Sequence, residues 1–313
     1  MKSLVFLAAL SLATGTTYAQ APLKKNEALV FCYFKGNGQD GLHLASSRDG
    51  YTWTALKRDS TFLRPTVAKD KLMRDPCIIR GQDGLFHMVW TVSWQDKGIG
   101  YANSKDLINW SEQQFLPVMQ QEAGARNCWA PEITYDPNTK SYLIYWATTI
   151  TGMFPETQIP SDTGYNHRIY STTTKDFKTY TPTTLLYEPG FNVIDSTIQP
   201  DGKRFVMFLK DETREPAQKN LRVAFSDKLT GPYSKASAPI TGNYWAEGPA
   251  TVKLGKEWLV YFDKYREHKY GLIKSTDLVN WTDVSDRLTV PKGLRHGTVF
   301  RVSAKELKLL EQQ

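Results

Sequence analysis

Residues 75–110 read DPCIIRGQDGLFHMVWTVSWQDKGIGYANSKDLINW, and this stretch contains the pattern that decides the fold. Two short runs, Cys77–Ile79 and Phe86–Trp90, are rich in apolar, β-branched and aromatic residues. The turn dipeptide Asp83-Gly84 lies between them. Such runs joined by an Asp-Gly turn are typical of an antiparallel β-hairpin. The stretch therefore predicts strand, turn and strand rather than helix.

The same stretch ends in a turn motif that recurs along the chain. The motif is Ser/Thr-x-Asp followed four to six positions later by an aromatic residue, and its Asp and Ser side chains can hold a tight turn by accepting backbone N–H bonds. The copy at Asp227 is looser because Ser226 directly precedes the Asp. The five copies are Asp49 with Trp53, Asp106 with Trp110, Asp176 with Tyr180, Asp227 with Tyr233, and Asp277 with Trp281.

A strand–turn–strand pattern alternates with these turns, so the whole chain is a fivefold repeat. The repeats begin at Asp75, Glu132, Asp195, Glu247 and His296. Helical periodicity is absent until residues 304–310. Repeats of this length hold a four-stranded blade each and must stack radially, which predicts an all-β, five-bladed β-propeller in one domain over residues 20–313. Residues 29–53 are expected to pair with the C-terminal strand near His296 and close the ring.

Composition excludes several classes of protein. The 313 residues are 41% hydrophobic and 12% aromatic, which excludes a disordered chain. The net charge of +7 is scattered along the chain rather than clustered, so no nucleic-acid partner is expected. The three cysteines (Cys32, Cys77 and Cys128) have apolar neighbours and no metal-ligand spacing, which indicates buried free thiols.

The first 19 residues have the pattern of a signal peptide. Lys2 precedes an apolar run over residues 4–13, and small residues lead to Ala19. We expect cleavage after Ala19 and a secreted or periplasmic protein; the alternative is a membrane anchor, although no lipid-accepting Cys follows the run. No later run is long enough to span a membrane, and a monomer is expected.

The first strand of a propeller blade lies next to the central axis, so residues at the start of each repeat are expected to converge on one funnel. Four of the five are acids. One alternative is that these acids only cap strands or bind solvent at the surface. However, pairs of carboxylates across a cavity are what glycoside hydrolysis requires, because one acid protonates the leaving oxygen while another carboxylate activates water or attacks the sugar.

Motifs around these positions occur in an order that resembles glycoside hydrolase family 43, over residues 29–302. They are Arg74-Asp75-Pro76, Trp129-Ala130-Pro131-Glu132, Ile194-Asp195-Ser196, Glu247-Gly248-Pro249 and Arg295-His296-Gly297. Members are five-bladed arabinofuranosidases, xylosidases and arabinanases that invert the anomeric centre. The resemblance implies that Asp75 is the general base, Asp195 the pKa modulator and Glu247 the general acid. One departure is Ser196, which stands where the family usually has Pro.

Further residues are candidates for substrate binding. The resemblance implies that Glu132 lines the site and that His296 lies beside an axial water or a calcium ion, which would make His296 a metal contact through water. The alternative for His296 is a structural core imidazole. Arg74 and Arg295 bring positive charge near the acids, or only pair with them. Trp94, Trp129 and Trp245 are candidates for contact with a sugar face or for blade packing. Residues 149–166 interrupt the repeat and are expected to form one wall of the pocket.

Three other functions are considered, two of them enzymatic and one non-catalytic. A retaining fructosidase-like enzyme would need an Asn-Asp-Pro nucleophile and a Glu-Cys acid, and this chain has neither. A sialidase is suggested by the turn at residues 47–53, but it would need six blades and three arginines. A non-catalytic carbohydrate-binding propeller would not need matched acids. The substrate is expected to be an oligosaccharide or polysaccharide from which a terminal α-L-arabinofuranosyl or β-D-xylosyl unit is released, with galactose-type sugars and endo action left open.

Overall fold

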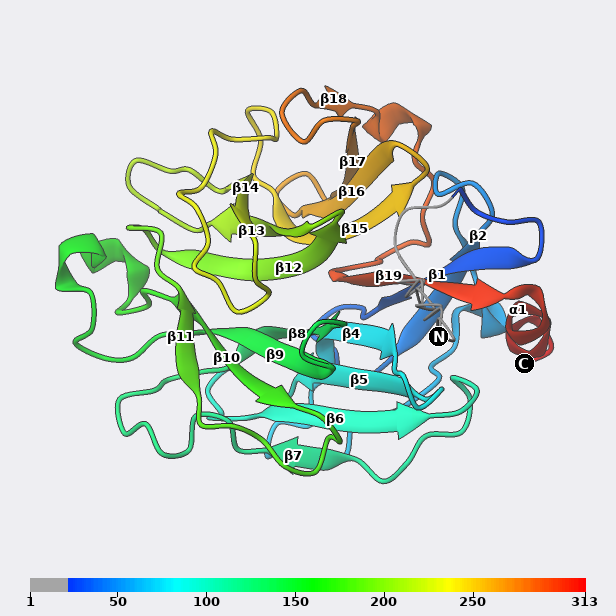
Figure 1. Cartoon of the computed structure of the whole chain (residues 1–313), viewed down its shortest axis with the longest axis horizontal. Coiled ribbons are helices and arrows are strands. Elements are labelled where there is room, and N and C mark those ends of the chain that lie inside the picture. Colours follow the sequence, from blue (N-terminus) through cyan, green and yellow to red (C-terminus); the bar gives the residue numbers. More distant parts are fainter. Residues whose placement is uncertain (1–21) are drawn as a thin grey trace, which may run out of the picture.

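The structure is a computed structural model that describes residues 22–313, so the predicted signal peptide lies outside the described residues. Nineteen strands form five antiparallel sheets arranged around an axis (Figure 1). Blade 1 comprises β19 (Gly297–Ser303), β1 (Glu27–Tyr33), β2 (His43–Ser47) and β3 (Thr54–Ala55). Blade 2 comprises β4 (Arg74–Arg80), β5 (Phe86–Thr91), β6 (Ile99–Ser104) and β7 (Gln114–Leu116).

The other three blades follow in chain order. Blade 3 comprises β8 (Trp129–Asp136), β9 (Ser141–Thr148), β10 (Arg168–Thr174) and β11 (Thr184–Tyr187). Blade 4 has only three strands: β12 (Val193–Asp201), β13 (Arg204–Asp211) and β14 (Asn220–Ser226). Blade 5 comprises β15 (Glu247–Leu254), β16 (Glu257–Lys264), β17 (Lys269–Ser275) and β18 (Thr282–Asp283). The predicted five-bladed β-propeller is confirmed.

Blade 1 closes the ring by joining the two ends of the described chain. β19 pairs with β1 from Glu27–Ser303 to Tyr33–Gly297, as expected for residues 29–53 and the strand after His296. The innermost strands β19, β4, β8, β12 and β15 each contact the next, and β15 contacts β19 again. All five innermost strands therefore start at the same end of one central axis (Figure 1).

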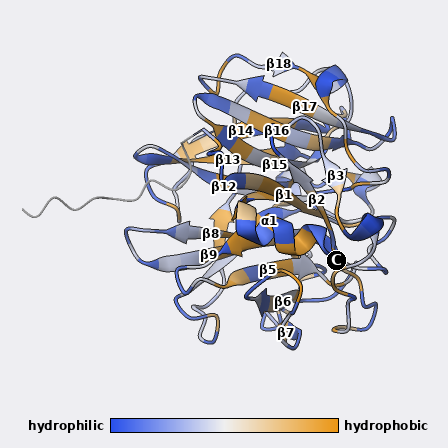
Figure 2. Ribbon diagram, turned by 90° about the vertical axis from the view of Figure 1, so that its right-hand side faces the viewer, coloured by the Kyte–Doolittle hydropathy of each residue, from blue (hydrophilic) through white to orange (hydrophobic). Residues whose placement is uncertain are grey.

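The hydrophobic core is divided into five layers, one between each pair of neighbouring blades. For example, Val30 of β1 packs with Ile78 and Trp90 of blade 2, and all three are buried. The middle strands are buried on both faces, as in β5, where all six residues of FHMVWT are buried. Figure 2 shows hydrophobic stretches within the stacked strands. Since every blade buries both faces against its neighbours, the units hold together only as a closed ring.

The repeated turn motif forms the turns that the sequence predicts. In the first copy, the Ser47 Oγ accepts the Gly50 N–H at 2.9 Å, and the Asp49 Oδ1 accepts the N–H groups of Tyr51 at 2.7 Å and Thr52 at 2.8 Å. The copies at Ser104, Thr174 and Ser275 make the same set of bonds. These turns lie where the third strand of a blade ends, opposite the start of the innermost strands.

Helix is confined to short segments. The one α-helix among residues 22–313 is α1 (Ala304–Glu311), which begins at a capping box formed by Ser303 and Glu306. The 3₁₀ turns are η1 (Lys57–Asp59), η2 (Pro155–Thr157), η3 (Pro160–Asp162) and η4 (Ser285–Arg287). No helix within residues 22–313 is long and apolar enough to cross a bilayer. The three cysteines are buried and unpaired, as predicted.

Candidate active site

Four of the innermost strands begin with the same irregularity. The pairing register with the second strand shifts between Arg74 and Cys77 in β4, and at the matching place in β8, β12 and β15. One residue of each bulge has a left-handed backbone: Asp75 (φ 49), Ala130 (φ 45), Asp195 (φ 50) and Gly248 (φ 61). Bulges re-aim side chains at the rim of a sheet. Here they turn the first residues of each blade toward the axis.

The bulges correct one sequence-based expectation, that the five starting residues share one register. Asp75 and Asp195 occupy the same bulge position, whereas Glu247 lies one residue earlier and Glu132 two residues later than that position. The repeat pattern assigns these acids to one position, because a bulge leaves no mark in the sequence. Ser196 occupies the position that Pro76, Pro131 and Pro249 fill in the other blades.

Asp75 is held from two sides. Its Oδ2 accepts the Thr91 hydroxyl at 2.9 Å, and its Oδ1 lies 3.3 Å from the Nδ1 of His296. Burial raises the pKa of Asp75, but His296 and the positive charge of Arg74 lower it more, so the balance leaves it below its usual value. This carboxylate is therefore ionised near neutral pH.

His296 connects Asp75 to the other acids. Its imidazole packs directly against Gly248, where a Cβ would come within 2.4 Å of the ring, and the Gly248 N–H donates to the Oδ2 of Asp195 at 3.0 Å. Burial lowers the pKa of His296, but the surrounding negative charge outweighs this effect and raises it to about 9. That charge comes from Asp75, Asp195 and Glu132. His296 is thus a cation inside the ring of acids.

Asp195 is buried, and its pKa is raised to about 6. Burial is the main cause, and the negative charges of Glu247 and Asp75 act in the same direction. The positive charges of His296 and Lys210 oppose the rise. Asp195 therefore changes charge within the pH range in which most enzymes are assayed.

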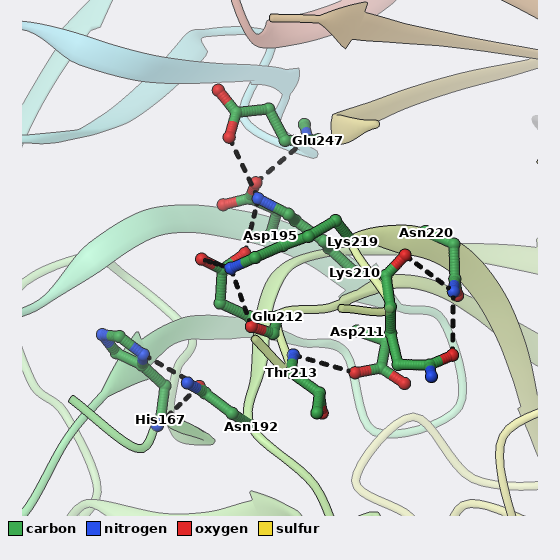
Figure 3. A network of polar contacts seen from close by, with 12 residues as sticks. His167, Asn192, Asp195, Lys210, Asp211, Glu212, Thr213, Lys219, Asn220 and Glu247 are labelled. Atoms are coloured by element: carbon green, nitrogen blue, oxygen red, sulfur yellow. Dashed lines mark hydrogen bonds and ion pairs between the residues drawn. The ribbon is translucent and has the colours of Figure 1, made fainter. Parts of the chain in front are cut away.

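Glu247 lies between two cations. Its Oε2 is 3.0 Å from the Nζ of Lys210, and its Oε1 is 3.0 Å from an NH2 of Arg295. Each cation is anchored on its far side by another carboxylate, Lys210 by Glu212 at 2.6 Å and Arg295 by Asp263 at 3.0 Å. Figure 3 shows Lys210 between Glu212 and Glu247. A row of alternating charges thus fixes the direction of the Glu247 carboxyl group.

Glu132 lies deeper along the axis than the other acids. Its Oε2 accepts the Tyr145 hydroxyl at 3.1 Å, and the residue is only 4% exposed. Burial raises the pKa of Glu132 to about 7, although Thr197, His296 and Tyr145 act against the rise. A carboxyl group this enclosed supports its neighbours more readily than it contacts a ligand.

Rings line the mouth on the side of blades 2 and 3. Trp94 is 44% exposed and lies edge-on to Trp129, with 5.5 Å between ring centroids. Trp129 in turn packs on Tyr165, the last part of the long loop that the sequence predicts as a wall. The Trp129 Nε1 donates to the Trp94 carbonyl at 3.0 Å, and the guanidinium of Arg74 stacks 4.3 Å from the Trp94 ring. These rings are fixed in place while one of them faces solvent.

Trp245 lies on the opposite side, beside blade 5. Its ring is 5.8 Å from that of Tyr265, and the guanidinium of Arg266 stacks on it at 4.4 Å. The Nζ of Lys210 lies 4.8 Å from the Tyr265 ring, which connects this aromatic pair to Glu247. The structure therefore brings all ten residues that the sequence nominates to one end of the propeller, with Trp94 and Trp245 at opposite rims.

Sequence reasoning missed the partners that hold the acids. Lys210, Asp263 and Thr91 lie at the ends of second strands, directly opposite the residues that begin the innermost strands. The signal was a charged residue closing an apolar strand, as in FVMFLKD over residues 205–211 and WLVYFDK over residues 258–264. A charged residue at the end of a strand is usually exposed to solvent, so its presence alone did not indicate a functional site.

The axial residues do not fit the calcium ion considered from the sequence. Within residues 22–313, no three His, Cys, Asp or Glu side chains are arranged to hold a metal ion. His296 is paired with Asp75 through Nδ1, so that nitrogen is not free to bind a metal ion directly, and the predicted contact through water stays a prediction. We therefore derive no step through a metal.

Comparison with known families agrees with this geometry. The family model of a probable glycosyl hydrolase domain, related to family 43, matches residues 24–308. The chain belongs to this family. The predicted relationship to glycoside hydrolase family 43 is therefore confirmed.

Relatives of this family-43-related glycosyl hydrolase are distant. An α-L-arabinofuranosidase of Bifidobacterium longum subsp. longum is 24% identical, and the match covers 59% of this chain but only 21% of that protein. The chain thus spans about a fifth of the length of this curated relative.

Solved structures share the fold at low identity. A thermostable family-43 glycoside hydrolase has a TM-score of 0.55 at 15% identity, covering 74% of this chain and 80% of that one. An α-L-arabinofuranosidase from Lactobacillus brevis has a TM-score of 0.53 at 18% identity, covering 68% and 72%. An exo-β-1,3-galactanase from Phanerochaete chrysosporium has a TM-score of 0.53 at 15% identity, covering 74% and 52%. These likenesses support the fold and leave the substrate open.

Proposed function

We propose that this chain is an exported, inverting glycosidase that releases a terminal pentose, α-L-arabinofuranosyl or β-D-xylosyl, from an oligosaccharide or polysaccharide. In this proposal Asp75 is the general base, Glu247 the general acid and Asp195 the residue that tunes the acid. The observation that carries it is the continuous set of contacts from Asp75 through His296 and Gly248 to Asp195, with Glu247 preceding Gly248 in the chain.

The charges support this division of roles. A general base must be ionised, and the lowered pKa of Asp75 meets that requirement. A general acid must point at the departing oxygen, and Lys210 and Arg295 hold the Glu247 carboxyl group in one direction. Asp195 is connected to this part of the site through the Gly248 N–H. Its pKa is raised to about 6, mainly by burial, so its charge changes under ordinary assay conditions.

The reaction follows from these positions. Asp75 accepts a proton from a water molecule, which attacks the anomeric carbon while the bond from that carbon to the glycosidic oxygen breaks. Glu247 donates its proton to the departing oxygen. One water is consumed and the sugar is released with inverted configuration. His296 lies beside Asp75 and helps to hold the carboxylate in place for this step.

Release of a terminal unit is supported by the wall beside the base. Trp94 and Trp129 pack edge-on beside the residues that begin blades 2 and 3, and Tyr165 of the long loop packs on Trp129. A buried Arg168 fixes this loop by donating to Asn166 and Thr157 and by pairing with Glu188. A fixed wall on one side suits a pocket that accepts a chain end more than an open cleft.

A panel of nitrophenyl glycosides tests the proposal. We expect turnover of the α-L-arabinofuranoside or the β-D-xyloside, with NMR showing that the first-formed sugar has the opposite anomeric configuration. Turnover of only the β-D-galactoside would agree with the roles assigned to the acids, but the released sugar would then be galactose rather than a pentose. Retention of configuration, or no turnover of any glycoside, would contradict the proposal.

Replacing Lys210 with Met is expected to lower kcat/KM by at least about tenfold, or ~1.4 kcal/mol of transition-state stabilisation. The cation lowers the pKa of Asp195, so its loss raises that pKa above about 6 and leaves the carboxyl group protonated at higher pH. If ionised Asp195 is required, the acidic limb of the kcat/KM profile moves to higher pH.

The pH profile separates this role from a structural one. Lys253→Met is the matched control, since Lys253 pairs with Asp201 at 2.9 Å at the opposite end of the blades. Thermal unfolding of both variants shows how much stability each ion pair contributes. An unchanged acidic limb in Lys210→Met, with activity falling only in proportion to the folded fraction, would mean that Lys210 does not tune the site.

A further inference from the structure

A hollow of about 310 Å³ lies beside the candidate active site, at the boundary of blades 4 and 5. Its walls come from the segments that lead into β14 and β15, so it opens at the end of the propeller where Glu247 begins β15. Its size is near the lower end of the range for small-molecule sites, which starts at about 300 Å³. The residues that bear side-chain polar groups or rings are Gln218, Asn220, Thr241, Asn243, Tyr244 and Trp245.

The lining suits a neutral sugar. Three carboxamides, from Gln218, Asn220 and Asn243, stand in the wall, and two of them already bond to each other through the Asn220 Nδ2 and the Gln218 Oε1. The exposed Asn243 carboxamide can donate to and accept from a sugar hydroxyl group. Tyr244 and Trp245 add rings that can pack on the apolar face of a sugar. No charged residue lines the hollow among the described residues. The lining residues themselves thus offer no counter-charge, although Arg266 and Lys219 lie against the Trp245 ring.

One atom in this wall lacks a partner. Asn220 is 6% exposed, and its Nδ2 donates to the carbonyl and the side-chain oxygen of Gln218 at 3.1 and 3.3 Å. Its Oδ1 is buried and accepts no hydrogen bond within residues 22–313. An unpaired buried acceptor costs about 1–3 kcal/mol. Asn220 is thus a polar residue of the wall that the protein itself leaves partly unsatisfied.

The hollow is connected to the proposed general acid through a series of contacts. Trp245 lies two residues before Glu247, and its ring packs on Tyr265. Tyr265 packs on Lys210, which contacts the Glu247 carboxylate. Figure 3 shows the Lys210 side of this series, with Asn220 nearby. These contacts link the wall of the hollow to the Glu247 carboxylate.

We propose that the hollow binds a neutral sugar of the leaving group, so that the enzyme selects oligosaccharides over short glycosides. This rests on the proposed function. The general acid must face the glycosidic oxygen, and the leaving group is bonded to that oxygen, so it lies on the Glu247 side. The base, Asp75, is in blade 2, away from the hollow. The terminal sugar occupies the space between them.

The test compares two substrates for each variant. One is the nitrophenyl glycoside that the panel selects, and the other is the trisaccharide of the same sugar (arabinotriose, xylotriose or β-1,3-galactotriose). For Trp245→Ala we expect the ratio of kcat/KM for the trisaccharide to that for the nitrophenyl glycoside to fall about tenfold, the size of an aromatic contact. Asn243→Ala should lower the same ratio by a smaller factor through a higher KM.

Controls make the outcome decisive. Asn243 is exposed, so Asn243→Ala keeps the test valid if Trp245→Ala is unstable. Asn138→Ala, in the turn between β8 and β9 at the other end of the propeller, should leave the ratio unchanged. An unchanged ratio in both hollow variants, or an equal loss on both substrates, would overturn the proposal.

Binding distinguishes failure of this inference from failure of the proposed function. If the parent enzyme turns over no glycoside, the proposed function fails. Saturation-transfer NMR with the three trisaccharides then tests whether the hollow binds a sugar, independently of any turnover. Signals in the parent protein that Trp245→Ala abolishes would support a sugar site. No signal from any trisaccharide, or the same signal in the variant, would overturn it.

Discussion

Glu247→Gln should lower kcat/KM for an oligosaccharide by about a hundredfold to ten-thousandfold, the range that general acid–base catalysis contributes. A glutamine has the size of the glutamate and fills the space between Lys210 and Arg295, but it has no proton to give to the departing oxygen. A dinitrophenyl glycoside needs little help because its leaving group departs as a stable anion. The loss should therefore be much smaller on the dinitrophenyl substrate, and comparing the two substrates measures it.

The dependence on the leaving group separates acid catalysis from a structural effect. Glu257→Gln is the matched control, because Glu257 lies at the other end of blade 5, at the turn between β15 and β16. Equal losses on both substrates would show that Glu247 is needed for something other than proton donation. Full activity of Glu247→Gln on the oligosaccharide would exclude it as the acid, and a carbohydrate-binding propeller would then be the better explanation.

Much of the architecture can be predicted because it depends on local chemistry. A turn held by Ser47 and Asp49 is determined by residues within five positions of each other, and the same residues recur in the other repeats. Four such turns and the looser copy at Asp227, alternating with hairpins, leave little choice except a ring of five blades. Closure by β19 followed from the same repeat, since residues 29–53 supply outer strands and the last copy supplies an inner strand for them.

The details of the site depend on contacts that no local pattern records. The bulges place Asp75 and Asp195 at one position and displace Glu247 by a residue, although all three begin their repeats in the sequence. Lys210 approaches Glu247 from a different blade, 37 residues earlier in the chain. Only the stacking of blade 4 on blade 5 brings these two charges together, so the sequence could nominate the acids but not the cations that orient them.

Asp75→Asn should lower kcat for oligosaccharide and dinitrophenyl glycoside alike, by about a hundredfold to ten-thousandfold. The amide cannot accept a proton from water, and attack by water is required whichever group leaves. Asp75 should not set the acidic limb of the parent profile, because its pKa lies below its usual value, whereas that of Asp195 is raised to about 6. Steady-state kinetics of both substrates, with Asp201→Asn at the opposite end of blade 4 as control, measures the loss.

Azide then decides what Asp75 does. As an anion it attacks without giving up a proton, so it should restore turnover of the dinitrophenyl glycoside by Asp75→Asn while doing little for the parent enzyme. If Asp75 is the base of a single displacement, the glycosyl azide has inverted configuration, because azide enters where water would. A glycosyl azide of retained configuration would mean two displacements through a covalent intermediate. The absence of any rescue by azide, in a variant that folds like the parent, would mean that Asp75 does not serve to activate the water.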